Sequence, residues 1–372
     1  MNRGRGLERL DRLLRRRVEQ EQTVPGAVVL VRSGREVIFH EAYGLRQREP
    51  LRLPMTRETL FDLASVTKCL GTALCAMRLW ERKRLDLDRP IEEVLGGLGA
   101  GGKSAITCRH LLSHSSGFPS WRPYFEEFPE ARSDVPCDEI VARILAEPLE
   151  SDPGSREVYS DLGFILLGRI VERLAEEPLD ELFLKAVARP LGLEKTRYRR
   201  LRFENQRPEA DSGPDIAATE RCRWRKRILV GEVHDENCYL MGGVAGHAGL
   251  FSTAREMDEI LAHLLSAWDG TPSLFSPEAV RTFFRKGTVV PGGTWGLGWD
   301  SPTRGASASG SYFSATSFGH NGFTGTSVWM DLERRIAVVL LSNRVHPDRA
   351  NLSIRALRPE VHDAVMEEIL QG

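Results

Sequence analysis

Ser65 lies three positions before Lys68, and a hydroxyl and an amine at this spacing form a nucleophile and base pair for acyl transfer. Leu63, Val66 and Leu70 recur at intervals of three or four, which predicts a helix whose first turn holds Ser65. Unpaired N–H groups at a helix N-terminus favour negative charge on the serine and on an oxyanion beside it. Ser-x-x-Lys also arises by chance, so the motif needs partners elsewhere in the chain.

The composition sets limits on the fold and on the partners. The chain has 372 residues, is 41% hydrophobic, and carries 51 Lys and Arg against 52 Asp and Glu. This length predicts one large globular domain or two interleaved ones. The net charge of -1 argues against nucleic-acid binding and fits an uncharged or zwitterionic small molecule or short peptide. Six cysteines without CxxC spacing indicate free thiols.

The N-terminal stretch is charged and lacks the apolar core of a signal peptide. No segment approaches the roughly 20 apolar residues that a membrane-spanning helix needs. We therefore expect no membrane span and a cytoplasmic location, or a periplasmic or secreted one if a leader has been removed. The sequence does not predict the oligomeric state.

The hydrophobic pattern predicts strands near both ends of the chain. Apolar runs at 26–31 and 36–39 flank Ser33-Gly34, which is typical of a β-hairpin. Runs at 324–330 and 335–341 predict a second hairpin, followed by a helix over 360–370. This order predicts an α/β (α+β) fold in which an antiparallel sheet carries helices on both faces.

The middle of the chain is mostly helical in pattern, with the clearest stretches at 138–146, 162–174 and 179–188. We therefore assign residues 1–78 and 235–372 to a sheet domain and 79–234 to a helical subdomain. Residues 205–236 are polar and predict a long surface loop. The basic run at 221–227 would suit nucleic acid, but the neutral total charge favours a solvated loop face.

Four stretches together resemble the serine β-lactamase and penicillin-binding protein family, in the branch of class C β-lactamases, D,D-carboxypeptidases and esterases. Leu63-Ala64-Ser65-Val66-Thr67-Lys68 resembles the nucleophile motif, and Tyr159-Ser160-Asp161 resembles the Tyr-x-Asn element. His110-Leu111-Leu112-Ser113-His114-Ser115-Ser116-Gly117 resembles the signature loop, and His320-Asn321-Gly322 resembles the Lys-Thr-Gly strand. The resemblance spans most of the chain and implies a β-lactamase/transpeptidase-like fold.

The resemblance implies an acyl-enzyme mechanism in which Ser65 attacks a carbonyl while Lys68 and Tyr159 move protons. It also implies an oxyanion hole formed by the backbone N–H groups of Ser65 and Phe323. Either Lys68 or Tyr159 can be the base. Asp161 replaces the usual asparagine and favours a cationic Lys68, which makes Tyr159 the favoured base of the two.

The resemblance also assigns substrate contacts to Asp161, His320, Asn321 and Gly322. His320 stands where the family has a lysine that attracts a substrate carboxylate. With an unperturbed pKa near 6.5, about one-quarter of this histidine is charged at pH 7, which disfavours efficient β-lactam turnover.

Asn343 and Arg344 follow the last predicted strand, where the family often keeps such a pair. They are candidates for recognising a substrate carboxylate, and the alternative is that Arg344 only caps the strand end.

No cofactor and no metal are expected. His110 and His114 lack the Glu of a His-Glu-x-x-His zinc helix and are interpreted as structural. The segment 231–249 contains further histidines and acids. It is interpreted as a loop that shapes the substrate pocket, with a metal site as the alternative.

The sequence thus predicts a serine hydrolase that cleaves an amide bond in a peptidoglycan-derived peptide or muropeptide. This substrate rests on analogy of fold. A carboxylesterase acting on small acyl esters is the alternative within the family. A penicillin-binding or sensor protein that is acylated without turnover is the alternative from another class. An α/β-hydrolase is disfavoured because no Gly-x-Ser-x-Gly elbow is present.

Overall fold

The central sheet contains segments from both ends of the chain. The computed structural model describes residues 7–96, 102–128, 132, 134–201, 203–204, 207–208, 215–303, 305 and 307–371. Its main sheet is antiparallel, with the strand order β11-β12-β13-β1-β2-β3. The strands are β1 (Gly26–Ser33), β2 (Glu36–Gln47), β3 (Leu53–Pro54), β11 (Ser317–Asn321), β12 (Ser327–Asp331) and β13 (Ile336–Ser342). Both predicted hairpins are therefore confirmed.

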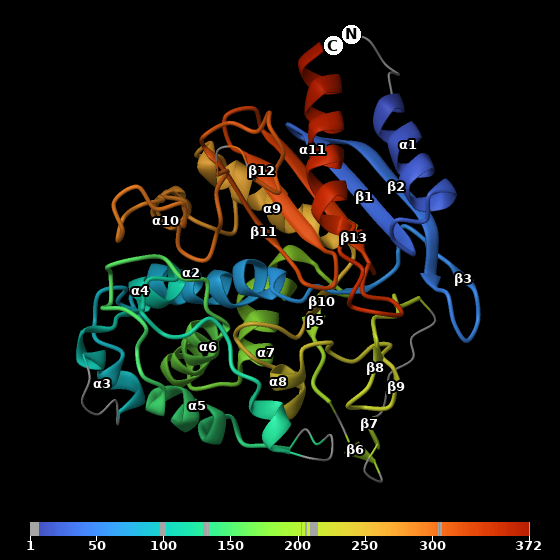
Figure 1. Ribbon diagram of the computed structural model, residues 1–372. Helices are drawn as coiled ribbons and strands as arrows, with labels where there is room; N and C mark the ends of the chain where they lie inside the picture. The colour runs from blue at the N-terminus through green and yellow to red at the C-terminus, as the bar shows by residue number, and fades with distance from the viewer. Residues whose placement is uncertain are drawn as a thin grey trace.

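Helices cover both faces of this sheet (Figure 1). Val29 and Val31 of β1 pack with α1 (Glu8–Leu14) and α11 (Ile354–Gln371), while Val28 and Leu30 pack with α9 (Ala254–Trp268). Successive side chains of a strand point to opposite faces, so a strand covered on both sides is apolar at every position. This explains the unbroken apolar run of β1 and confirms the predicted fold class.

The elements between the two halves of the sheet are mostly helices, and the three clearest predicted stretches are helical. The first helix of the chain continues as η1 (Arg15–Gln20), and the helix after Ser65 consists of η2 (Lys68–Ala73) and α2 (Leu74–Glu81). The following helices are α3 (Glu92–Leu95), η3 (Lys103–Ala105), α4 (Cys108–Leu112), η4 (Tyr124–Glu127), α5 (Cys137–Ala146), α6 (Asp161–Ala175), α7 (Leu179–Phe183), η5 (Leu184–Ala188) and η6 (Arg189–Leu191). Later helices are α8 (Glu236–Leu240) and α10 (Pro277–Phe283). The division into two domains stays a prediction.

A small second sheet joins the segment before Ser65 to the helical part. Its order is β4-β10-β5, formed by β4 (Phe61–Asp62), β10 (Leu250–Ser252) and β5 (Arg197–Tyr198). All six cysteines are free thiols, as predicted. None of the helices in the described part of the chain is long and apolar enough to cross a membrane.

The predicted surface loop at 205–236 is only partly correct. It contains the short strands β7 (Arg207–Pro208), β8 (Arg221–Cys222) and β9 (Arg227–Ile228), while β6 (Phe203–Glu204) precedes it, and residues 205–206 and 209–214 lie outside the described residues. Residues 216–220 and 231–234 are buried.

Arg225 is also buried, and the expectation of a solvated basic face is wrong for this residue. Its guanidinium donates to the backbone oxygens of Val233 and His234 and lies 4.0 Å from the centre of the Tyr239 ring. A guanidinium has five donors in a fixed fork, so Arg225 can bind the turns of its own loop instead of an external anion.

Candidate active site

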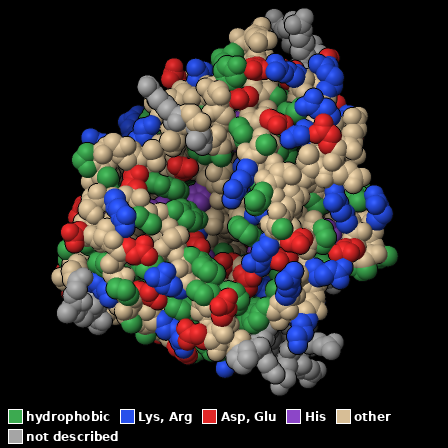
Figure 2. All heavy atoms as spheres, viewed as in Figure 1, with side chains coloured by type: hydrophobic (Ala, Val, Ile, Leu, Met, Phe, Trp, Pro, Cys, Tyr) green, Lys and Arg blue, Asp and Glu red, His purple; other side chains and the backbone are tan. Residues whose placement is uncertain are grey.

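A cleft of about 700 Å³ lies where the sheet, the helical part and the 231–249 segment meet. Figure 2 shows a hollow on one face of the molecule, with histidine at its wall and Lys or Arg side chains along its border. Eight of the residues singled out from the sequence line this cleft: Ser65, Tyr159, Asp161, His320, Asn321, Gly322, Phe323 and Arg344. Lys68 is buried beneath it.

Ser65 stands at the entrance to a helix, as predicted. The chain becomes helical at Val66, and the preceding Ala64 has a φ of 46°, in the left-handed region that residues other than glycine rarely adopt. The Ala64 N–H donates to Oδ1 of Asp62 at 2.8 Å, which holds this turn. Strained backbone of this kind often marks a functional site.

Lys68 connects the nucleophile to an acid. Its Nζ donates to Oγ of Ser65 at 3.1 Å and to the backbone oxygen of His247 at 3.1 Å, and lies 2.6 Å from Oδ1 of Asp161. Burial alone would lower the pKa of Lys68, but the Asp161 carboxylate and the Tyr159 phenol raise that pKa above its usual value. Lys68 is therefore an ammonium at neutral pH, as the Asp161 replacement predicts.

Tyr159 lies just before α6, whose N-cap is Ser160. The Ser160 N–H donates to Nδ1 of His114 at 3.1 Å, and the rings of His114 and Tyr159 are 4.7 Å apart. Burial raises the pKa of Tyr159 to about 12, although Lys68 and a hydrogen bond with Ser65 act in the opposite direction. The phenol is therefore protonated at neutral pH, and the leaning towards a Tyr159 base is not supported.

His114 and His110 have the structural roles predicted for them. His114 orients the segment that carries Tyr159 and also packs against Trp295, with ring centres 4.4 Å apart. His110 caps α4 through a reciprocal hydrogen-bonded pair with Thr107.

The two backbone amides predicted to form an oxyanion hole have no acceptor among the described residues. Neither the Ser65 nor the Phe323 N–H donates in any hydrogen bond that we find among the described residues. Both residues line the cleft. A Cβ atom at Gly322 would lie 2.0 Å from Oγ1 of Thr326 and 2.5 Å from the backbone oxygen of Leu63, so this position requires glycine.

His320 is neutral, and the expected partial charge at pH 7 is wrong. Its Nδ1 donates to the backbone oxygen of Asn321 at 2.9 Å, and its side chain is buried. Burial and the neighbouring Lys68 lower the pKa of His320 to about 3. The sequence could not reveal this because the shift depends on packing from distant segments.

Asn343 does not contact the cleft, which corrects its predicted role in substrate binding. Its Oδ1 accepts from the Gly26 N–H at 3.1 Å, and its Nδ2 donates to the backbone oxygens of Arg46 and Ala218 at 3.0 and 3.3 Å. The amide is therefore committed to holding backbone segments together.

Arg344 does line the cleft, but most of its donors are occupied. It donates to the backbone oxygens of Phe323, Arg349 and Asn351 at 2.7–2.9 Å, and it stacks on the Phe323 ring at 4.4 Å. Its guanidinium therefore holds these backbone segments in place, and it also contributes positive charge to this wall of the cleft.

Sequence reasoning missed Trp121, Trp295, Asp300, Arg355 and Arg358, which also line the cleft. No local motif marks them, because each reaches the cleft from an element outside the four family stretches.

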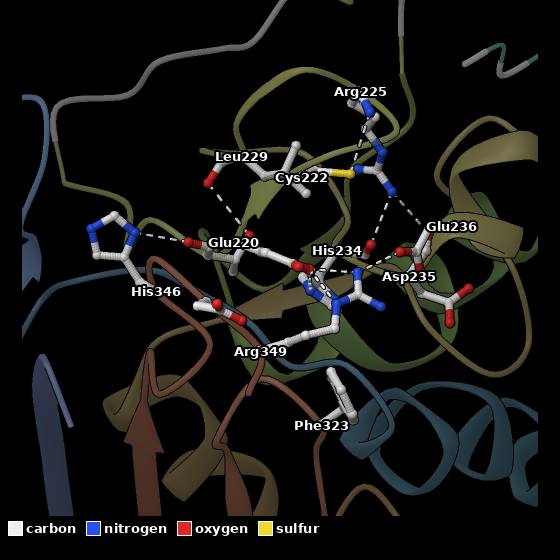
Figure 3. A network of polar contacts seen from close by, with 12 residues as sticks. Glu220, Cys222, Arg225, Leu229, His234, Asp235, Glu236, Phe323, His346 and Arg349 are labelled. Carbon is white, nitrogen blue, oxygen red and sulfur yellow. Dashed lines mark hydrogen bonds and ion pairs between the residues drawn. The ribbon is translucent and has the colours of Figure 1, made fainter. Parts of the chain in front are cut away.

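Figure 3 shows a network of polar contacts, and three of its members, His234, Glu236 and Arg349, line the cleft. Oε2 of Glu220 accepts from His234 at 2.8 Å and from Nε of Arg349 at 2.6 Å, and Arg349 also pairs with Glu236. Burial alone would raise the pKa of Glu220, but the bonds from His234 and Arg349 lower that pKa to about 2.

The same network reaches the nucleophile turn through the backbone of His234, whose N–H donates to Oδ2 of Asp62 at 2.6 Å. The prediction that the 231–249 segment shapes the pocket is confirmed, since His234, Asp235, Glu236 and Ala248 line the cleft. His247, which the metal alternative would use, bonds Asp235 at 2.8 Å.

The family model described as Beta-lactamase matches residues 10–362. The chain belongs to the beta-lactamase family. It is therefore a serine hydrolase of the family and fold that the four stretches predict.

Two relatives are similar over most of their length. A Bacillus subtilis (strain 168) protein named "N-acetylmuramyl-L-alanine amidase" is 33% identical over 373 residues, covering 91% of this chain and 81% of that protein. An Escherichia coli O157:H7 protein named "Putative D-alanyl-D-alanine carboxypeptidase" is 31% identical over 371 residues, covering 91% and 82%.

Solved structures agree with the fold. The hydrolase EstCE1, described as having promiscuous acyltransferase activity, has a TM-score of 0.72 at 24% identity, covering 95% of this chain and 98% of its own. A penicillin-binding protein homologue from Pyrococcus abyssi has a TM-score of 0.69 at 24% identity, covering 95% and 77%.

Proposed function

We propose that this beta-lactamase-family protein cleaves an amide bond in a peptidoglycan-derived peptide or muropeptide through an acyl-enzyme on Ser65. The observation that carries the proposal is the cluster at the floor of the cleft, where Ser65 Oγ, Lys68 Nζ and Asp161 Oδ1 follow one another at 3.1 and 2.6 Å. A serine in contact with a proton-accepting pair, beside unbonded backbone amides, has the parts that acyl transfer needs.

Lys68 and Asp161 together act as the base. Asp161 first takes a proton from the Lys68 ammonium, which frees a lone pair on Nζ. Lys68 then takes the Ser65 proton as Oγ bonds to the amide carbonyl carbon. The carbonyl π electrons move to the oxygen, which accepts hydrogen bonds from the N–H groups of Ser65 and Phe323. This assignment follows from the ionisation states, because the pKa directions leave Lys68 as an ammonium and Tyr159 as a phenol.

Tyr159 acts as the general acid. When the tetrahedral intermediate collapses, the C–N bond breaks and the amine leaves with the phenol proton. Tyr159 recovers a proton from Lys68, and Asp161 returns one to Lys68. Water then adds to the acyl carbon and gives one proton to the Lys68 and Asp161 pair. The bond between the acyl carbon and Oγ of Ser65 breaks, Oγ takes that proton back, and the acid leaves.

The substrate class draws on the two relatives, one named as an N-acetylmuramyl-L-alanine amidase and the other as a putative D-alanyl-D-alanine carboxypeptidase. The aromatic and cationic lining of the cleft supports a peptide or muropeptide, because Trp121 and Trp295 offer apolar surface while Arg344 and Arg358 attract an acidic group. The cytoplasmic location remains part of the proposal.

A substrate panel tests this function. We expect kcat/KM to be highest for an N-acetylmuramyl-peptide or a D-Ala-D-Ala peptide, and Ser65→Ala to abolish that turnover. A preference for p-nitrophenyl esters, with no cleavage of either amide, would make the protein a carboxylesterase. Stable acylation by penicillin without turnover of any substrate would indicate a sensor.

A further inference from the structure

The turn between β11 and β12 is held from behind by a guanidinium. Nη2 of Arg358, on α11, donates to the backbone oxygen of Gly322 at 2.6 Å and to that of Thr326 at 2.8 Å. These are the residues that bracket Phe323, whose N–H is one of the two proposed oxyanion donors. Arg358 also lines the cleft.

The Gly322 oxygen and the Phe323 N–H belong to the same peptide group. This group is planar and trans, so its C=O and N–H point in opposite directions. A bond that fixes the oxygen towards Arg358 therefore fixes the N–H in the other direction. A charged donor on the oxygen also polarises the peptide and makes its N–H a stronger donor.

The second oxyanion donor is tied to this turn. Oγ1 of Thr324 donates to the backbone oxygen of Asp62 at 2.9 Å, and Oγ1 of Thr326 donates to that of Leu63 at 2.9 Å. The turn therefore holds a constant position relative to the segment that leads into Ser65. Fixing the turn aligns both donors with one point in the cleft.

The acceptors that we find for Arg358 among the described residues are the two backbone oxygens of this turn. Across the described residues we find no carboxylate within ion-pair distance of Arg358 or Arg344, which both donate to backbone oxygens, and Nε of Arg358 is buried without a hydrogen bond. Burial and the Arg344 charge lower the pKa of Arg358 to about 9, so it stays cationic at neutral pH. Burying a charge without an ion-pair partner costs stability, so a role in the site gives a reason for arginine at this position.

We propose that Arg358 is a positioning residue of the oxyanion hole, which orients and polarises the Gly322–Phe323 peptide and supplies positive charge behind it. The inference rests on the proposed function, since it concerns the same acyl transfer. Arg358 does not touch the reacting atoms. It acts through the backbone and strengthens binding of the transition state more than binding of the substrate.

Three variants separate this role from a general loss of structure. Arg358→Met removes charge and donor, Arg358→Gln keeps a neutral donor, and Arg358→Lys keeps the charge. Arg281→Met is the matched control, because Arg281 is exposed on α10 and lies outside the cleft. Each protein is assayed with p-nitrophenyl acetate and with phenylboronic acid, which forms a tetrahedral adduct on a catalytic serine.

We expect Arg358→Met to lower kcat by on the order of 10- to 100-fold, which is less than the loss of a whole oxyanion donor. KM should change less than about threefold, and phenylboronic acid affinity should fall in parallel with kcat. Activity should rank Arg, Lys, Gln, Met, while Arg281→Met behaves as the wild type. If Arg358→Met does not fold, the inference is tested by whether Arg358→Lys is more active than Arg358→Gln.

Two results would overturn the inference: a Gln variant as active as the wild type, or a loss confined to KM with unchanged boronate affinity. Ser65→Ala distinguishes a failure of the proposed function from a failure of the inference about Arg358. If Ser65→Ala still hydrolyses the ester, the proposed function fails. If Ser65→Ala is inactive while every folded Arg358 variant is fully active, only the inference fails.

Discussion

At the scale of single residues, the contact between Lys68 and Asp161 decides how protons move. Asparagine at position 161 would leave a neutral amide beside Lys68, whereas the aspartate lies 2.6 Å from Nζ and keeps the lysine charged. An acid next to an amine can take a proton that the amine alone would hold. The pair can therefore act as a base although Lys68 itself is fully protonated at rest.

The acid role of Tyr159 predicts a dependence on the leaving group. Tyr159→Phe should lower kcat for amide substrates by on the order of 100-fold or more, because an amine must leave with a proton. The same variant should lower p-nitrophenyl ester turnover by less than about 10-fold, since p-nitrophenolate leaves as an anion. Steady-state kinetics on both substrate types checks this. Equal losses would instead give Tyr159 the role of base.

The neutral state of His320 predicts the effect of restoring a cation. His320→Lys should lower KM for substrates with a carboxylate near the scissile bond by on the order of 10-fold, because an ammonium replaces an uncharged imidazole. His320→Gln is the control, since it adds no charge and should give no such gain. An unchanged KM in the lysine variant would contradict the charge argument.

At the scale of elements, the turn after β11 fixes part of the site. Gly322→Ala should lower kcat by 10-fold or more and lower the free energy of unfolding by about 1–3 kcal/mol, because the added methyl group meets Thr326 and Leu63. Urea unfolding and ester kinetics measure the two effects. Gly192→Ala, where a Cβ meets nothing within 4 Å, controls for glycine replacement away from the cleft, although its φ of 67° adds some strain. Wild-type kinetics in Gly322→Ala would show that the turn tolerates displacement.

Elements with strong local patterns could be predicted from the sequence, and contacts between distant segments could not. The hairpin of β1 and β2 and the helices at 137–146 and 161–175 follow from hydrophobic period and turn residues. Asp62 and Arg358 carry no such signal, because their partners His234 and Gly322 are brought to them only by the complete fold.

The same reasoning explains the errors at the scale of the site. Asn343 and Arg225 have the residue types of ligand-binding groups, but each bonds backbone from other parts of the chain. A polar side chain that is fully occupied by backbone looks the same in a sequence as one that is free for substrate. Residue type and order therefore predicted the cluster around Ser65 better than they predicted the other residues that line the cleft.

At the scale of the whole molecule, Asp300 links the cleft to the pH dependence of stability. Burial raises the pKa of Asp300 to about 7, against 3.8 for the ordinary group. Below about pH 3.8 the carboxyl is protonated in both folded and unfolded chains. As pH rises towards 7 only the unfolded chain ionises, so the folded state loses stability through this window.

Asp300→Asn should remove this loss, because asparagine does not ionise. Relative to the wild type, its free energy of unfolding should increase between pH 4 and pH 8 by on the order of 1–4 kcal/mol. Urea unfolding at pH 4, 6 and 8 measures the difference, and Asp152→Asn, at an exposed position, serves as the control. A constant difference between Asp300→Asn and the wild type across this range would mean that Asp300 titrates normally.

The central claim is that Ser65 accepts an acyl group from substrate, and mass spectrometry of the labelled protein tests it most directly. After incubation with a fluorophosphonate probe, the intact protein should gain one adduct, and peptide sequencing should locate it on Ser65. Ser65→Ala should gain none. An adduct on another residue, or an equal gain in Ser65→Ala, would contradict the claim.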